Sequence, residues 1–197
     1  MNRPDFSQYI AHFTKNSSRG MAIDNLVNIL RNKVIEASSM PWTDARAVCF
    51  TECPWSSILA HTEKYSPYGI GFHKATVYAK HGGPVYYIRP DHYQMQKDNG
   101  GFDSRVLPFL TPFSPAYRPD NLNDDRWNHT VDYTQEREWR VPHDFPFDYK
   151  DIKFVILPDY KTMAEFHKDF KDIIGRENFI LLDNYKRIEE LWPVHIQ

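Results

Sequence analysis

Cysteine is scarce in this sequence, and long apolar runs are absent. The 197 residues contain two cysteines, Cys49 and Cys53, which are so close together that a bridge would close only a very small loop. We therefore expect free thiols rather than a disulfide framework. The longest apolar runs, such as 154–157 and 179–182, fall far short of the ~20 residues that a membrane-spanning helix needs. The sequence thus predicts no membrane association.

An excess of positive charge is also absent. Lys and Arg number 24 against 26 Asp and Glu, which gives a formal net charge of -2. Without an overall positive field, the chain could bind nucleic acid only through a local patch. The segment from Met1 to Asp5 has neither the apolar region nor the cleavage site of a secretory signal. We therefore expect a cytoplasmic protein.

Aromatic residues are the abundant class. The chain has 13 Phe, 12 Tyr and 5 Trp, and its hydrophobic share of 41% and charged share of 25% are ordinary for a globular protein. This composition argues against a disordered, collagen-like or coiled-coil protein. It predicts a core built largely from rings.

Hydrophobic periodicity predicts alternating strands and helices in the two ends of the chain. We expect one α+β domain over residues 1–197, because no repeat or internal boundary is evident. The expected strands are 9–14, 47–51, 68–72, 85–88, 152–157 and 179–182, and the expected helices are 22–34, a segment from Pro54 to about His61, and one carrying Met163, Phe166, Phe170 and Ile173 or Ile174.

Between these parts, residues 89–130 form an insertion rich in Pro and Gly. It predicts turns, with a short helix near Tyr93. Loops of this length are often functional or mobile.

The clearest alternation in the sequence runs from Val131 to Val141 and predicts a strand. Its polar face would carry Glu136, Glu138 and Arg140 at two-residue spacing. Such a ladder is equally typical of the solvent face of a sheet. If the face lines a site, a carboxylate there can hold a sugar hydroxyl or stabilise an oxocarbenium-like transition state, and Arg140 can restrain a carboxylate or bind phosphate.

Further polar side chains lie at or near the ends of two other predicted strands. His12 and Thr14 share one face of the first strand and could meet a ligand, although a lone strand histidine is more often structural. The Cys49–Pro54 segment leads into a helix N-terminus, where free N–H groups can meet an anion. Its Cys-x3-Cys spacing lacks a second pair, so we predict no zinc site. No dinucleotide fingerprint, Walker loop, nucleophile elbow or H-E-x-x-H motif is present.

Taken in order, these segments resemble the abortive phage resistance AbiGi antitoxin family over roughly residues 9–157. The resemblance implies a role in phage defence or a toxin–antitoxin pair. The motifs that carry it are His12-Phe13-Thr14, Leu26-Val27-Asn28-Ile29-Leu30, Val48-Cys49-Phe50-Thr51-Glu52, His61, Tyr68-Gly69-Ile70-Gly71-Phe72 and Glu136-Arg137-Glu138-Trp139-Arg140.

The same order is similar, more distantly, to the ADP-ribosyltransferase fold, a mixed or antiparallel sheet with flanking helices around bound NAD. That resemblance implies that His12 and Glu138 hold ribose hydroxyls, that Thr51 supports the site, and that Glu136 lies beside the acceptor. Phe50 or His61 would stack on nicotinamide, with Thr14, Tyr68 and Arg140 as further contacts. The glycine that usually follows the His-x-Thr element is replaced by Lys15-Asn16.

Two functions follow as alternatives. In the first, the protein uses NAD to modify a protein, DNA or RNA acceptor, or hydrolyses NAD. The fixed carboxylate would then stabilise the transition state more than the ground state. In the second, it is a non-catalytic antitoxin or binding protein on the same fold. A metal-dependent nuclease using Asp132, Glu136 and Glu138 is a weaker alternative, because that strand has no lysine and the chain is not basic.

Overall fold

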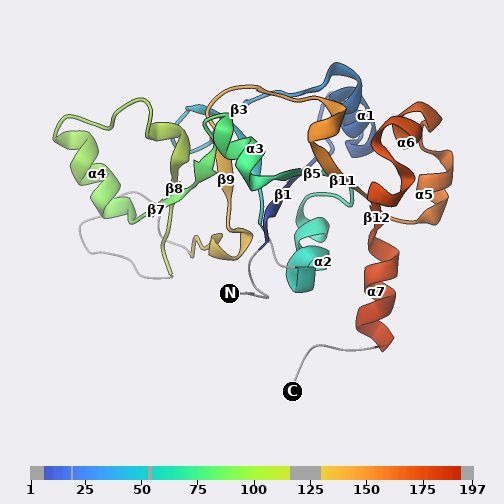
Figure 1. The fold of residues 1–197 in the computed structure, drawn as a ribbon. Coiled ribbons are helices and arrows are strands. Elements are labelled where there is room, and N and C mark those ends of the chain that lie inside the picture. The colour runs from blue at the N-terminus through green and yellow to red at the C-terminus, as the bar shows by residue number, and fades with distance from the viewer. Residues whose placement is uncertain (1–6, 19, 53–54, 116–129, 192–197) are drawn as a thin grey trace.

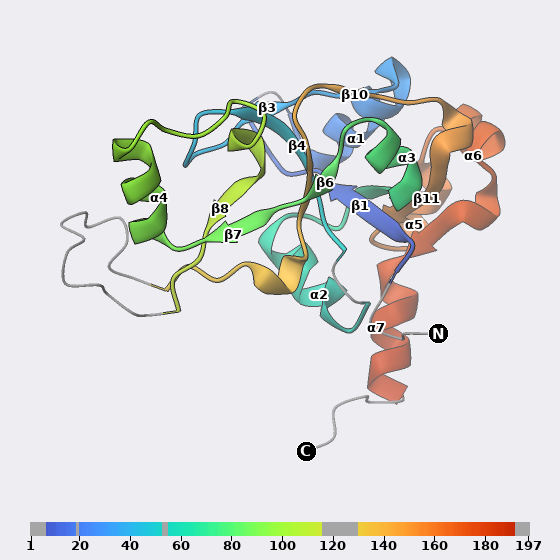
Figure 2. The same cartoon turned by 60° about the vertical axis from the view of Figure 1, so that its left-hand side comes forward.

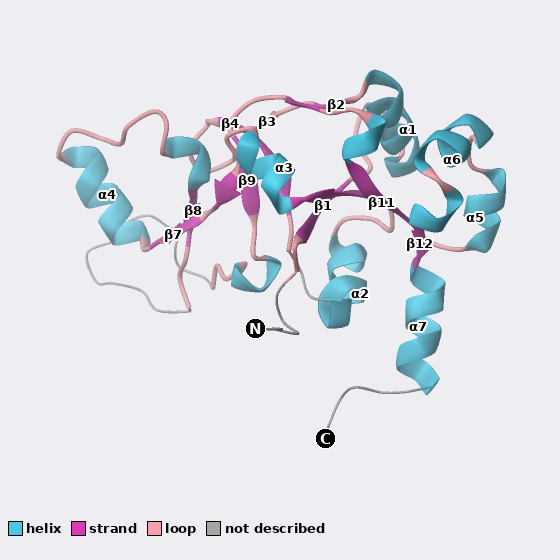
Figure 3. Cartoon of the chain, viewed as in Figure 1, coloured by secondary structure: helices cyan, strands magenta, loops and turns pink. Residues whose placement is uncertain are grey.

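The computed structural model describes residues 7–18, 20–52, 55–115 and 130–191. They form the expected mixture of helices and strands (Figures 1 and 3). The helices are α1 (Ala22–Asn32), α2 (Trp55–Lys64), α3 (Lys74–Ala79), α4 (Pro90–Asp98), α5 (Tyr160–Glu165), α6 (Lys168–Ile174) and α7 (Leu182–Leu191). The strands are β1 (Tyr9–Phe13), β2 (Val34–Ile35), β3 (Ser38–Ser39), β4 (Arg46–Phe50), β5 (Gly69–His73), β6 (Gly83–Pro84), β7 (Tyr86–Ile88), β8 (Leu110–Pro112), β9 (Trp139–Val141), β10 (Phe145–Pro146), β11 (Ile152–Leu157) and β12 (Phe179–Leu181).

Two four-stranded sheets organise the fold, in the orders β1-β5-β11-β12 and β3-β4-β9-β6. All neighbours are antiparallel except β11 and β12, which are parallel. The sheets meet where Ala11 and Thr51 exchange backbone hydrogen bonds of 2.9 and 2.8 Å. Shorter pairings join β2 to β10 and β7 to β8. The mixed and antiparallel α+β architecture expected from the sequence is confirmed.

Rings fill much of the core between the sheets, as the composition predicts. Phe50, Phe72 and Phe145 are each at most 2% exposed. Their ring centroids lie 5.0–6.1 Å apart in edge-to-face arrangements, which aromatic pairs favour. Helix α1 adds Leu26 and Leu30 to the same core. The absence of a side chain at Gly71 in β5 lets the Phe154 ring of β11 lie directly over that glycine.

The predicted strand over 131–141 is wrong in its first two thirds. Residues Thr134–Glu136 form a 3-10 turn, Arg137 is left-handed with φ 44°, and only Trp139–Val141 pairs as β9. The Asp132 carboxylate accepts hydrogen bonds from both the backbone N–H and the hydroxyl of Thr134. Such a local bond offers the backbone an alternative to a ladder, which the alternation of residue types does not reveal.

The predicted helix carrying Met163 to Ile174 is two helices, α5 and α6. The chain becomes extended at Phe166, where ψ is 149°. The buried ammonium group of Lys171 in α6 donates hydrogen bonds of 3.0 Å to the carbonyls of Met163 and Ala164 at the end of α5. It thereby satisfies acceptors that a helix end leaves without partners.

The 89–130 insertion contains the helix expected near Tyr93, which is α4. It also contains β8 and a 3-10 turn at Leu107–Phe109 (η1), which the sequence reading missed. Helix α4 with β7 and β8 extends to one side of the sheets, and α7 extends from the opposite part of the fold (Figure 2). The remainder of the predicted insertion, 116–129, and the predicted helix start at Pro54 lie outside the described residues.

The sequence predicts neither α3 nor α7: it assigns no element to α3, and only the end of the expected strand 179–182 falls within α7. Within the described part of the chain, no helix is both long and apolar enough to cross a membrane.

Candidate functional site

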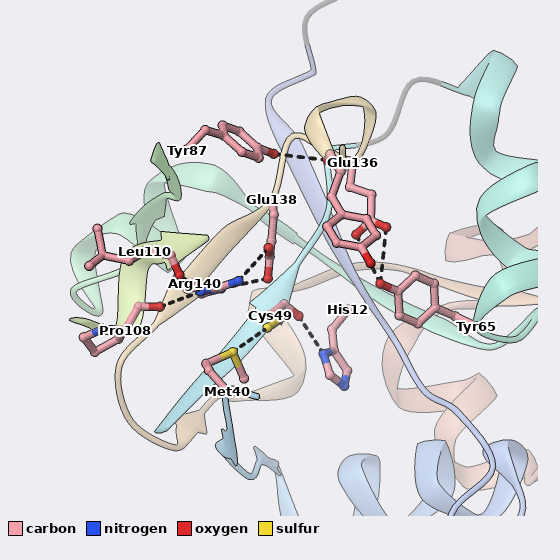
Figure 4. Close-up of polar contacts among 11 residues, drawn as sticks. His12, Met40, Cys49, Tyr65, Tyr87, Pro108, Leu110, Glu136, Glu138 and Arg140 are labelled. Atoms are coloured by element: carbon pink, nitrogen blue, oxygen red, sulfur yellow. Dashed lines mark hydrogen bonds and ion pairs between the residues drawn. The ribbon is translucent and has the colours of Figure 1, made fainter. Parts of the chain in front are cut away.

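The candidate site lies where β4 and β9 pair. Cys49 is opposite Arg140 and Phe50 is opposite Trp139, so the segment preceding β9 runs beside the end of β4. This register brings Glu136, Glu138 and Arg140 close to Thr51, as the sequence predicts. Because of the turn at Arg137, however, the two carboxylates do not share one strand face and enter separate contacts (Figure 4).

Glu138 is held by Arg140. The guanidinium Nε and Nη2 donate to the two carboxylate oxygens over 2.8 and 2.9 Å, and the two side chains are only 8% and 12% exposed. The third nitrogen, Nη1, donates to the carbonyls of Pro108 and Leu110 over 3.0 and 2.9 Å. Burial opposes the charge of Arg140, but its bonds to Glu138 outweigh this effect and raise the Arg140 pKa. The Glu138–Arg140 pair is therefore a fixed, fully bonded unit.

Glu136 is held by different groups. One carboxylate oxygen accepts a 2.6 Å bond from the Lys64 ammonium, and the Tyr65 hydroxyl lies 3.1 and 3.3 Å from the two oxygens. The Lys64 ammonium also lies over the rings of Tyr133 and Tyr65, at 4.2 and 5.3 Å from their centroids. Burial and the neighbouring Glu136 carboxylate raise the Tyr65 pKa, so its hydroxyl stays protonated.

Thr51 links the two segments. Its hydroxyl donates to the carbonyl of Glu136, and the N–H of Glu52 donates to the same carbonyl over 3.2 Å. The position expected to support the site therefore does contact the carboxylate-bearing segment. It does so through the backbone of that segment.

His12 belongs to β1, which bridges to the end of β4, whereas Arg140 belongs to β9, which also pairs with β4. Among the described residues, β1 and β4 are joined by an isolated bridge between Ala11 and Thr51, and the Cys49 carbonyl lies beyond this bridge. The His12 Nδ1 lies 2.8 Å from this carbonyl and can only donate to it, which leaves Nε2 unprotonated in the neutral ring. Burial lowers the His12 pKa despite this bond. His12 thus completes the junction between the sheets as a neutral donor.

His61 is brought into the same region by α2. Its ring stacks on Tyr65, with centroids 4.6 Å apart, and meets the edge of Phe13. Burial lowers the His61 pKa, although the Glu136 carboxylate acts in the opposite direction. A buried neutral imidazole therefore packs one ring away from Glu136.

Three of the expected NAD contacts do not lie with the carboxylates. The Thr14 hydroxyl donates to the carbonyl of Ala22 over 2.8 Å and is buried beside α1. The Tyr68 ring lies near Asp159, whose charge adds to burial in raising the Tyr68 pKa. Phe50 is 2% exposed among core rings. In this structure Phe50 has no open ring face on which nicotinamide could stack.

The sequence reading missed Lys64, Tyr65, Tyr87 and Tyr133. Lys64 and Tyr65 follow His61 by three and four residues, which places them on one helix face once α2 extends to Lys64. Tyr87 donates its hydroxyl to the carbonyl of Tyr133 over 3.1 Å. Helical spacing could have revealed the first two residues, but no spacing rule links Tyr87 to Tyr133.

Cys49 is a free thiol in the described structure, as expected. Its sulfur lies 3.7 Å from the Met40 sulfur, and burial together with Glu138 raises its pKa. A thiol held protonated is a poor nucleophile. Cys53 lies outside the described residues. Among the residues that are described, no three His, Cys, Asp or Glu side chains are grouped so that they could hold a metal ion.

Comparison with known protein families gives a match to part of the chain. Residues 22–104 match the family described as "Putative abortive phage resistance protein AbiGi, antitoxin". This segment runs from α1 past α4 and contains β4, α2 and β5, but it includes neither His12 nor Glu136–Arg140. The match supports the expected resemblance over a shorter range. No curated protein and no solved structure matches the chain.

Proposed function

We propose that this chain is the antitoxin of an abortive-infection phage-defence system and acts by binding a partner protein. One observation carries the proposal. The polar groups of the candidate site bond one another, since Arg140 makes two bonds to Glu138, and Lys64 and Tyr65 both bond Glu136. The family match over 22–104, whose description ends in "antitoxin", supports the same function.

The free-energy cost of displacing Arg140 also favours a non-catalytic binding protein over an enzyme whose substrate binds to Glu138. A ribose hydroxyl would have to displace a guanidinium that makes two bonds to Glu138 and two to backbone carbonyls. Breaking a buried ion pair costs about 3–5 kcal/mol. A hydrogen bond between a sugar hydroxyl and the Glu138 carboxylate would contribute only about 1.5–3 kcal/mol of binding free energy.

Co-expression in a bacterial host tests this function. Each candidate partner, taken from genes adjacent to the one that encodes this chain, is placed under an independent promoter, and the readout is growth. We expect the partner alone to arrest growth and this chain to relieve the arrest. Glu138→Gln, shown to be folded by its thermal melt, should relieve it equally well. Growth arrest caused by this chain alone would contradict the proposal.

A second function rests on a different observation. Thr51 contacts the segment that carries Glu136 and Glu138, and His12 lies at the adjacent Cys49 carbonyl with Nε2 unprotonated. These are the groups that the likeness to ADP-ribosyltransferases assigns to NAD. The second candidate is therefore an NAD-using transferase or glycohydrolase in the same defence system, with Glu138 as the catalytic carboxylate.

Two measurements distinguish the antitoxin from the NAD-using enzyme: the thermal shift caused by NAD and the release of nicotinamide. If the chain binds NAD, a concentration of 100 times Kd should raise its stability by about 2.7 kcal/mol. An enzyme should release nicotinamide, and Glu138→Gln should abolish that release without unfolding the protein. Release at the same rate from Glu138→Gln would make Glu138 a structural residue.

A further inference from the structure

The ammonium group of Lys64 lies against three side chains. The Glu136 carboxylate is 2.6 Å from it, and the ring centroids of Tyr133 and Tyr65 are 4.2 and 5.3 Å away. Two ring faces and a carboxylate are what proteins use to hold alkylated ammonium groups. We call Tyr65, Tyr133 and Glu136 the ammonium cage.

The cage carboxylate and its occupant differ in exposure. Glu136 is 7% exposed and is fixed by Tyr65, and its own carbonyl is held by Thr51 and Glu52. The Lys64 side chain is 47% exposed and is the last residue of α2. Because lysine has a flexible four-carbon stem, Lys64 can leave the cage for solvent, whereas the cage stays in place.

A buried carboxylate needs a positive partner, but nothing in this geometry requires that partner to belong to the chain. Tyr133 is 41% exposed among the described residues, so solvent reaches part of this ring. An external ammonium group entering from the side of this ring would find the same carboxylate and ring faces. The Arg140 guanidinium does not compete for the cage, because its three nitrogens are bonded to Glu138 and to two carbonyls.

We propose that the ammonium cage is a binding site for an organic ammonium group, and that Lys64 occupies it as a built-in competitor. The ligand chemistry has two sources, a lysine side chain of another protein or a small quaternary ammonium compound. A tethered group competes at an effective concentration of about millimolar or more. Removing Lys64 should therefore strengthen binding of an external ammonium group at least about tenfold.

Calorimetric titration of Lys64→Met tests the proposal, with the wild type and Lys97→Met on α4 as matched controls. The probes are choline, its neutral isostere 3,3-dimethylbutan-1-ol, and Nα-acetyl-lysine methylamide. We expect Lys64→Met to bind choline or the lysine amide at least about tenfold more tightly than either control does. The neutral isostere should not bind, and adding Glu136→Gln to Lys64→Met should abolish binding.

The results of this titration distinguish the two ligand sources from each other and from the absence of an ammonium site. Tighter binding of the lysine amide assigns the cage to a protein side chain, and tighter binding of choline assigns it to a small quaternary ammonium compound. Equal binding of choline and the neutral isostere would overturn the proposal, because an apolar pocket would explain it. Absence of binding by folded Lys64→Met would overturn it as well.

A measurement on the wild-type residue covers the case in which Lys64→Met does not fold. Reductive dimethylation with carbon-13 labels each lysine ammonium, and the Lys64→Arg variant identifies the Lys64 signal. Because Lys64 lies over two rings, that signal should be shifted upfield, and choline should move it towards the free position. A Lys64 signal without a ring shift, or one that choline leaves in place, would contradict the cage.

Discussion

Glu136 and Glu138 are two residues apart, and their carboxylates are equally buried, yet they are held in different ways. Glu138 has a rigid partner that is itself anchored by two carbonyls, whereas Glu136 has a half-exposed lysine and a tyrosine hydroxyl. The Glu138–Arg140 pair, whose guanidinium also bonds two carbonyls, fixes β9 against η1 and β8. A pair with a flexible member leaves a carboxylate that another cation can reach. Burial alone therefore does not distinguish a structural carboxylate from one that can bind a ligand.

Arg140→Met should give the largest effect. It leaves Glu138 buried without a cation and frees the carbonyls of Pro108 and Leu110. Removing one member of a buried pair costs about 3–5 kcal/mol. Urea denaturation should show this loss of unfolding free energy. A loss below about 1 kcal/mol, as for an exposed pair, would remove the contrast between the two glutamates.

His12→Ala should have the next largest effect, because it leaves the Cys49 carbonyl at the sheet junction without a donor. An unsatisfied buried acceptor costs about 1–3 kcal/mol. His12→Asn keeps a donor at this position and should retain most of the stability. Denaturation of both variants checks this, and equal losses would show that ring packing on Phe50 matters more than the hydrogen bond.

Stability should also fall in mild acid. Burial lowers the pKa values of His12 and His61 below the ordinary 6.5, so the unfolded chain binds protons at a higher pH than the folded one does. Their contribution is complete above about pH 6.5 and is lost as the pH falls from there through the folded pKa values. Melts of the wild type and His12→Asn across pH 5–8 should show a shallower loss for the variant. Parallel curves would contradict a buried neutral His12.

Lys64→Met leaves the buried Glu136 carboxylate without its cation, but the Tyr65 hydroxyl still bonds that carboxylate and solvent reaches the position of the half-exposed lysine. We therefore expect a smaller loss of unfolding free energy than for Arg140→Met. Urea denaturation beside Arg140→Met measures the contrast directly. A cost as large as that of Arg140→Met would make Lys64 a fixed structural partner and would weaken the case for an exchangeable occupant.

Arg105→Ala should show the smallest effect. Arg105 and Asp103 form a bidentate pair as short as the buried one, but it is on the surface. Solvent already stabilises both charges there, so we expect no measurable change in the urea midpoint. A clear loss would indicate that contact geometry, rather than burial, sets the strength of the Glu138–Arg140 pair.

The sequence predicts the first sheet well because its strands are short apolar runs. The predicted strands 9–14, 68–72, 152–157 and 179–182 became β1, β5, β11 and β12, each shifted by at most one residue at either end. Most residues of β1, β5 and β11 are buried, and such runs are recognisable from the sequence alone.

The segment 131–141 shows why the candidate site was harder to predict. Its alternation placed Glu136 and Glu138 on one polar strand face, whereas the turn at Arg137 separates the two residues. Local bonds from Asp132 favour this turn, and a partner from α2, distant in sequence, pairs with Glu136. Long-range ion pairs leave no periodic trace, so their members are recognisable only in the folded chain.

A structure of the chain determined with saturating NAD tests the central claim most directly. If the chain is a binding protein whose carboxylates hold their own cations, the Glu138–Arg140 pair remains intact and no ribose lies against Glu138. A nicotinamide ribose bonded to Glu138, with Arg140 displaced from that carboxylate, would contradict the account and establish the NAD-using alternative.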